Sequence, residues 1–184
     1  METEDFMTNS IRSALSILLA STGLAACGGV YIDPGITDSC SESNDSCPGQ
    51  TICVFGLCEP AFPRIFTISV DQVLFADTDR NGGCWDLPCG PPDPYVVIQV
   101  DGREVGRTSE RPDTFGASWG DIFQVSLDRD SDLEIIALDT DIDTDDEAVT
   151  CSAFPVSADL LRARTLSCGD RGRTSYAHVT IDPR

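Results

Sequence analysis

The chain has 184 residues, with 31 Asp or Glu against 12 Lys or Arg, and its formal net charge is −19. That length suits one ordinary domain with small appendages. A chain with so large an acidic excess has no basic stripe with which to neutralise phosphates, which excludes a nucleic acid as its partner.

The N-terminal segment has the pattern of a targeting signal. A short apolar run over residues 14–26 follows Arg12 and is too short to span a bilayer. The run ends in Leu24-Ala25-Ala26-Cys27-Gly28, which resembles a bacterial lipobox. The resemblance implies that Cys27 is acylated and becomes the first residue of the mature protein. The alternative is an ordinary secretory peptide with an incidental cysteine.

These features assign the first part of the chain to export and anchoring. We expect a lipoprotein signal peptide over residues 1–26, whose start is either Met1 or Met7, and a tether over residues 27–39. The mature protein is then expected to be lipid-anchored and non-cytoplasmic, in the cell envelope, at the outer membrane or the cell surface.

The cysteine content agrees with an exported protein. Nine cysteines are present, and removing the lipidated Cys27 leaves eight, an even number that suits disulfides in an oxidising compartment. Residues 40–60 contain four of them and too few apolar residues for a core, so we expect a small module held by two disulfides. The pairing stays open among three possibilities, and zinc binding is the alternative. These four cysteines are Cys40, Cys47, Cys53 and Cys58.

From residue 61 onward the chain has the pattern of an all-β domain. Residues 95–100 are strongly β-branched and end at Asp101-Gly102, a hairpin signal. Only residues 157–164 have a helical pattern. Several short strands with turns between them predict one antiparallel β-sandwich over residues 61–184. The other predicted strands lie near residues 66–73, 105–108, 122–127, 133–138 and 175–181.

Two segments rich in aspartate each follow a predicted strand. Hard oxygen donors in loops are what Ca²⁺ prefers, and so many carboxylates repel one another unless a cation lies between them. Asp139 and Asp141 are two positions apart and therefore point to one face, at a tip where neighbouring strands of a sandwich meet. We predict a Ca²⁺ site with ligands drawn from Asp77, Asp79, Asp93, Asp139, Asp141, Asp146 and Glu147.

Two alternatives to a shared site stay open. The aspartates could be only solvated turn-formers in an acidic protein. A self-contained loop using Asp77, Asp79, Asn81 and Asp86 is also possible, because its spacing is similar to the opening of an EF-hand loop. Its twelfth position is Pro88 rather than Glu, however, so an EF-hand is not expected.

Three ordered blocks of the sequence follow the pattern of one known family. The first is the run from Asp93 to Ile98, Asp-Pro-Tyr-Val-Val-Ile, at the start of a predicted strand. The second is Trp119-x3-Phe123-x-Val125, and the third is the strand that ends in Asp139-x-Asp141. These blocks resemble the strand start, the Trp-x-x-x-Phe block and the D-x-D loop of the C2 domain, a calcium-dependent membrane-binding β-sandwich. The resemblance covers about residues 64–183. It implies an eight-stranded antiparallel Greek-key sandwich, here preceded by the disulfide-rich module.

The sequence departs from the family pattern at several positions. Ser118 stands where the family has Pro. After the last ligand the family has Ile-Gly, whereas this sequence has Ala148-Val149-Thr150. The last ligand is therefore either Asp146 or Glu147. The first ligand is either Asp77 or Asp79.

Four further cysteines lie in the predicted sandwich. We favour the pairs Cys84–Cys89, which closes a ring on the first Asp-rich loop, and Cys151–Cys168; the alternative is that each pairs elsewhere. With that ring closed, we expect apolar side chains beside the metal to contact a lipid interface, where Trp is favoured. These side chains are Trp85, Leu87 and Ile142. The alternative is that Trp85 packs under its own loop.

The expected function is that of a lipid-anchored, Ca²⁺-binding module that attaches to membrane phospholipid or to an envelope glycolipid or protein. The alternative is a calcium-independent structural or adhesive envelope lipoprotein that acts through protein contacts. Catalysis is not expected: the only histidine, His178, lies in the middle of a predicted strand, and no G-x-S-x-G motif is present.

Overall fold

The computed structural model describes residues 39–86, 88–141, 144–169 and 174–184, all within a compact unit that spans residues 35–184. The predicted signal peptide and Cys27 lie outside the described residues, as do Leu87 and Ile142. Within the described part, no helix has both the length and the apolar character needed to cross a membrane.

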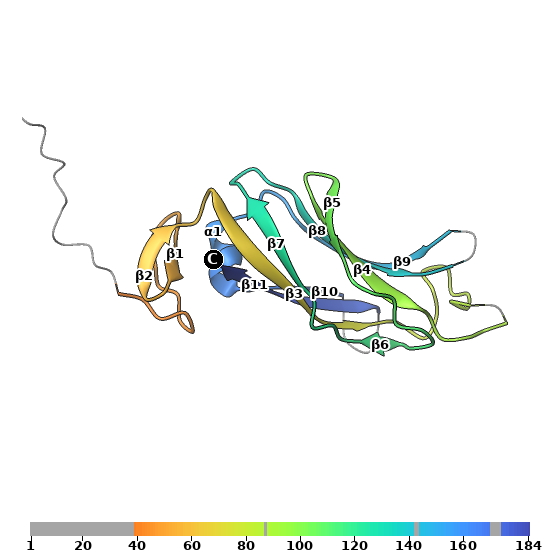
Figure 1. The fold of residues 1–184 in the computed structure, drawn as a ribbon. Helices are drawn as coiled ribbons and strands as arrows, with labels where there is room; N and C mark the ends of the chain where they lie inside the picture. Colours follow the sequence, from red (N-terminus) through yellow and green to blue (C-terminus); the bar gives the residue numbers. More distant parts are fainter. Residues whose placement is uncertain (1–38, 87, 142–143, 170–173) are drawn as a thin grey trace, which may run out of the picture. The chain divides into compact units, whose positions relative to one another are not determined.

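Two antiparallel sheets form the main body (Figure 1). The prediction of an all-β, eight-stranded sandwich is confirmed, because β6 and β7 pair with the two ends of the same strand β3 and together form one interrupted strand. The first sheet has the order β10 (Thr165–Gly169), β11 (Tyr176–Pro183), β3 (Arg64–Leu74), then β6 (Gly116–Ala117) and β7 (Ile122–Leu127). The second has the order β5 (Arg103–Arg107), β4 (Pro94–Val100), β8 (Leu133–Asp139), β9 (Asp146–Ala153).

The core lies between the two sheets and follows from strict alternation along the strands. On β3, Phe66, Ile68 and Val70 are fully buried while the residues between them are half-exposed. Because successive side chains point to opposite faces of a strand, one apolar face per sheet packs against the other. Burying one such side chain contributes about 1.5–3 kcal/mol.

Strand β4 is buried on both faces. Val96 and Ile98 face the core, and Tyr95 and Val97 on the outer face are only 4% and 2% exposed. The guanidinium of Arg107 covers that outer face, 4.7 Å from the centre of the Tyr95 ring. A strand covered on both sides needs an almost continuous apolar run, which is the pattern seen in the sequence.

The connections that follow β3, β5 and β8 meet at one end of the sandwich. The backbone N–H of Phe75 donates to Phe115 (2.7 Å), that of Thr114 to Pro92 (2.8 Å), and that of Thr140 to Asp93 (3.2 Å). We call this end the tip and define it by residues 75–86, 88–93, 108–115, 139–141 and 144–147.

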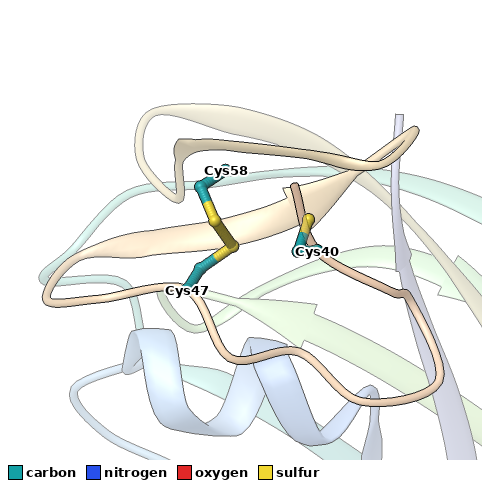
Figure 2. Close-up of side chains that lie close together, drawn as sticks. All are labelled: Cys40, Cys47 and Cys58. Atoms are coloured by element: carbon teal, nitrogen blue, oxygen red, sulfur yellow. A yellow bond between two sulfur atoms is a disulfide. The ribbon is translucent and has the colours of Figure 1, made fainter. Parts of the chain in front are cut away.

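Strands β1 (Thr51–Val54) and β2 (Leu57–Pro60) form a hairpin, which we call the stapled hairpin because two disulfides hold it. The disulfides are Cys40–Cys53 and Cys47–Cys58. Figure 2 shows Cys47 and Cys58 joined, with the Cys40 side chain beside them. The sulfurs of Cys40, Cys47 and Cys58 are near enough together to hold a metal ion, but as disulfides they offer no thiolate ligand.

Arginines around helix α1 (Ala158–Ala163) connect this hairpin to the sandwich. Arg162 donates through Nε to the carbonyl of Cys47 (3.2 Å) and through Nη2 to that of Gly49 (2.5 Å). Arg164 donates to the carbonyl of Cys53 (2.5 Å). The hairpin is therefore packed on the sandwich within the same compact unit.

We expect Arg164→Ala to lower the free energy of unfolding by about 1–3 kcal/mol, because it removes charge-assisted hydrogen bonds to Cys53 and to Asp182 (3.2 Å) at a side chain that is only 14% exposed. Thermal unfolding measures the loss as a lower Tm. Arg103→Ala, at an exposed position on β5, is the matched control and should change stability by less than about 0.5 kcal/mol. Equal effects of the two substitutions would contradict the role given to Arg164.

Candidate functional site

Three carboxylates from two connections meet at the tip. Oxygen atoms of Asp86, Asp139 and Asp141 lie within 4.8 Å of one another. Asp139 is the last residue of β8 and Asp141 follows it, while Asp86 comes from the connection between β3 and β4. Strand pairing brings the two connections together, because Pro94 at the start of β4 is directly opposite Asp139.

Asp139 is the central residue of this group. It continues the inward-facing series of β8 after Leu133, Ile135 and Ala137, and its side chain is fully buried. Its Oδ1 accepts the backbone N–H of Asp93 at 2.5 Å, whereas its Oδ2 is buried without a hydrogen-bond partner in the described part of the chain. A buried carboxylate oxygen without a partner is costly, and a cation is the partner that suits it.

The electrostatics of the group are unfavourable without a cation. Burial raises the pKa of Asp139 to about 6, the Asp93 N–H opposes that rise, and the charges of Asp86, Asp141 and Asp93 add to it. Burial also raises the pKa of Asp86, with the charges of Asp93 and Asp113 acting in the same direction. The neighbouring carboxylates therefore disfavour ionisation of Asp86 and of Asp139, and bound positive charge would relieve this repulsion.

Asp93 lies beside the three carboxylates and organises the backbone around them. Besides donating its N–H to Asp139, it accepts the N–H of Asp113 through Oδ1 at 2.6 Å. It is half-buried, and its charge acts on both Asp86 and Asp139. The donor set at the tip is thus entirely oxygen, which is the chemistry that Ca²⁺ takes.

The other predicted acidic ligands lie elsewhere on the tip, outside the three-carboxylate group formed by the residues that the structure describes. Asp79 accepts the N–H groups of Asn81 (2.7 Å) and Gly83 (2.6 Å) and so closes its own turn. Glu147 forms an ion pair with Arg80 at 2.6 Å. Asp77 is exposed, and Asp146 begins β9, where it pairs across the sheet with Asp139.

The expectation that Trp85 contacts a lipid interface is wrong. Its side chain is only 4% exposed, its ring packs edge-on against Phe75 at 5.0 Å, and its Nε1 donates to the carbonyl of Ala76 at 2.7 Å. Because the indole N–H has a hydrogen-bond partner inside the loop, the ring can be buried without leaving this donor unsatisfied. The open alternative, packing under its own loop, is what the structure has. The predicted contacts Leu87 and Ile142 fall outside the described residues.

The shared ligand set predicted from the sequence left out Asp86, which appeared only in the alternative self-contained loop. The structure contains the disulfides Cys84–Cys89 and Cys151–Cys168, the two pairs favoured from the sequence. Asp86 is the only carboxylate between Cys84 and Cys89. That placement was the available signal, because a ring of this size holds its one acidic residue in a restricted position.

An antiparallel eight-stranded sandwich with carboxylates grouped at one tip defines a class of β-sandwich modules that generally bind calcium and membranes. The sequence profile of the C2 domain matches residues 58–180, and the chain belongs to this family. No curated protein matches the chain.

Solved structures agree on the fold. A calcium-bound pair of C2 domains from Extended-Synaptotagmin 2 has a TM-score of 0.50 and 19% identity, over 66% of this chain and 45% of that chain. A second structure is a human GIVD cytosolic phospholipase A2 in complex with methyl gamma-linolenyl fluorophosphonate inhibitor and terbium chloride. It has a TM-score of 0.51 and 18% identity, over 65% of this chain and 17% of that chain. A structure described as a C2 domain has a TM-score of 0.50 and 17% identity, over 65% of this chain and 97% of that chain. This chain thus spans less than half of the first of these chains.

Proposed function

We propose that the protein is a lipid-anchored C2 module that binds Ca²⁺ at the tip and thereby attaches to membrane phospholipid or to an envelope glycolipid or protein. Asp86, Asp139 and Asp141 would hold the ion, with Asp93 beside them. The observation that carries this proposal is the buried Oδ2 of Asp139, which has no protein partner among the described residues and lies beside two further carboxylates.

The charge of the chain supports attachment through a cation. Without residues 1–26 the chain loses Glu2, Glu4, Asp5 and Arg12 and still carries a formal net charge of −17, so anionic lipid repels it. When bound, Ca²⁺ supplies local positive charge that can be shared with phosphate or carboxylate groups of a ligand. The aspartates of the tip supply the oxygen donors, and their backbone contacts keep them in place.

A basic lipid-binding face is less well supported. Arg107, on the outer face of the four-stranded sheet, already pairs with Glu104 at 2.9 Å and covers the ring of Tyr95. Because its guanidinium has these partners, recognition of a phosphoinositide headgroup by this face is not part of the proposal.

Anchoring is proposed from the lipobox alone. Acylation of Cys27 would tether the module in the cell envelope, at the outer membrane or cell surface. An attachment through the tip would provide a second point of contact.

A calcium-independent adhesive role is the second candidate, and one observation favours it. Phe55, at the turn of the stapled hairpin, is 84% exposed. An aromatic side chain presented at a rigid turn suits a protein contact. In that case ligand binding should persist in the presence of a chelator and fall on Phe55→Ser.

Calorimetric titration of the full-length chain with CaCl₂ tests the calcium proposal. We expect saturable binding with a Kd of about 10⁻⁴ to 10⁻³ M, as in other extracellular sites, and a rise in Tm that corresponds to about 1.4 kcal/mol at ten times Kd. Asp141→Asn should weaken binding, whereas Asp130→Asn, at an exposed position in the β7–β8 connection, should not.

Sedimentation with vesicles then tests attachment. Vesicles of phosphatidylcholine with phosphatidylserine should bring down the protein in CaCl₂ and release it in a chelator, while pure phosphatidylcholine should bind it less. A protein that binds Ca²⁺ without sedimenting would retain the site but exclude anionic phospholipid as its ligand. Absence of Ca²⁺ binding at 10 mM, about ten times the weakest expected Kd, would refute the site itself.

A further inference from the structure

Asp86 lies inside a small covalent ring at the tip. The disulfide Cys84–Cys89 joins residues only five positions apart. The carbonyl of Asp86 accepts the N–H of Cys89 within the ring at 2.7 Å and that of Gly90, the residue after the ring, at 3.2 Å. The chain therefore turns back on itself around Asp86, and its carboxylate lies close to those of Asp139 and Asp141.

The backbone at Cys89 depends on that closure. Its φ of 114° lies in a region that residues with a side chain rarely adopt. Such a conformation persists only when the surroundings impose it. Here the disulfide and the hydrogen bond to Asp86 both act on Cys89. With the sulfur–sulfur bond open, we expect Cys89 to relax towards negative φ and the hydrogen bonds to the Asp86 carbonyl to break.

The other carboxylates of the group are held by regular structure. Asp139 is the last residue of β8, which is paired on both sides, by β4 and by β9. Asp93 is fixed through its N–H bond to Asp139. Asp86 belongs to no strand, and its fixed neighbour Trp85 anchors the ring on one side only. Closure of the ring is therefore the main constraint on the position of Asp86.

The same disulfide is the most accessible of the four that join the described residues. Cys84 and Cys89 are both exposed. Each of the other three disulfides has one sulfur in the interior, with Cys53 0%, Cys47 5% and Cys151 1% exposed. Thiol–disulfide exchange requires a thiolate to reach a sulfur atom, so a reductant in solution meets Cys84–Cys89 first.

We propose that the Cys84–Cys89 disulfide positions Asp86 as a ligand, so that the tip binds Ca²⁺ tightly only while this bond is closed. The inference rests on the proposed function. In the opening step an external dithiol gives two electrons and two protons: the sulfur–sulfur bond breaks, Cys84 and Cys89 become thiols, and the dithiol is oxidised to a cyclic disulfide. Calcium affinity is then under thiol control from outside the protein.

Calorimetry on the full-length chain tests the proposal with the double variant Cys84→Ser, Cys89→Ser. We expect its Kd for Ca²⁺ to rise about 10- to 100-fold, as is typical when a group that orients a metal ligand is lost. Dithiothreitol should produce the same rise in the wild type, at a concentration where alkylation and mass spectrometry show that only Cys84 and Cys89 are reduced. The double variant, which lacks the reactive bond, should not respond to dithiothreitol and is the control.

The outcomes separate this inference from the proposed function. A wild-type protein that binds Ca²⁺ and a double variant with the same Kd would overturn the inference and leave the calcium site standing. No binding by the oxidised wild type would refute the site first. Asp86→Asn in the oxidised protein should raise Kd as much as the double variant does; an unchanged Kd for Asp86→Asn would mean that the ring does not act through this carboxylate. Should the double variant not fold, the dithiothreitol titration of the wild type decides alone.

Discussion

Replacing Asp139 with asparagine should raise the Tm of the calcium-free protein and, at the same time, abolish the rise in Tm that Ca²⁺ produces. Asparagine has nearly the same shape and keeps an Oδ1 acceptor for the N–H of Asp93. It removes a charge that is fully buried beside Asp86 and Asp141, and its amide can donate to those carboxylates. A substitution that only damaged the fold would lower Tm instead.

The size of the effect follows from the raised pKa of Asp139. The pKa is about 6 in the folded protein against 3.8 for an unperturbed aspartate, a difference of about two pKa units or roughly 3 kcal/mol. Because the folded pKa is the higher one, folding favours the neutral acid. The associated stability is fully present below about pH 4 and is lost as pH rises through 6. At pH 7 the wild type has lost this stability, because Asp139 must ionise in a buried position. Asparagine carries no charge at any pH, so the Asp139→Asn variant avoids the cost of a buried charge.

Thermal unfolding at pH 7 in a chelator and in 10 mM CaCl₂ measures both effects. In chelator we expect Asp139→Asn to raise the free energy of unfolding by about 1–3 kcal/mol, and each kcal/mol raises Tm by about 2–4 °C for a domain of this size. CaCl₂ should give this variant no further rise in Tm. Asp130→Asn should behave like the wild type in both buffers. A lower Tm for Asp139→Asn in chelator would contradict the unfavourable electrostatics assigned to this residue.

Removing the disulfide Cys151–Cys168 should cause the largest loss of stability. The bond joins β9 of the four-stranded sheet to β10 of the five-stranded sheet, and Cys151 is 1% exposed in the core. The two cysteines are 17 residues apart, and closing a loop of about 15 residues in the unfolded chain is worth about 3 kcal/mol. The double variant Cys151→Ala, Cys168→Ala should therefore unfold about 6–12 °C below the wild type.

Denaturant unfolding gives the same comparison at one temperature. The midpoint should fall, and the control Ser152→Ala, at the exposed neighbouring position on β9, should stay within about 0.5 kcal/mol of the wild type. If both variants unfolded at the wild-type midpoint, other contacts would have to hold the two sheets together at this edge.

Most of the fold was predictable because strand patterns are local. The alternation in residues 66–73 and 175–181 produced the fully buried faces of β3 and β11, and the apolar run at residues 95–100 became a strand covered on both sides. The helical pattern at residues 157–164 became α1, capped by the Ser157 side chain at the Leu160 N–H. Each of these elements depends on residue type at neighbouring positions, which a single sequence displays.

The candidate site was predictable only in part. Asp139 and Asp141 are two residues apart at the end of a predicted strand, so their proximity was expected from strand geometry alone. Asp86 was expected only in the alternative self-contained loop, because its place beside Asp139 depends on a ring closed by Cys84–Cys89. The lipid contact expected of Trp85 was wrong because its indole N–H finds a carbonyl within its own loop, which no periodicity reveals.

By itself, the sequence determined the class of fold, the acidic character of one end, and the aspartates that end β8, because these follow from alternation and composition. Tertiary structure alone decided which further acids lie beside Asp139 and Asp141. The register of β4 on β8 places Pro94 opposite Asp139. The ring closed by Cys84–Cys89 places Asp86 beside Asp139, whereas Glu147 forms an ion pair with Arg80. Carboxylates that look alike in the chain thus differ in burial and in partners, because both are set by contacts between residues far apart in sequence.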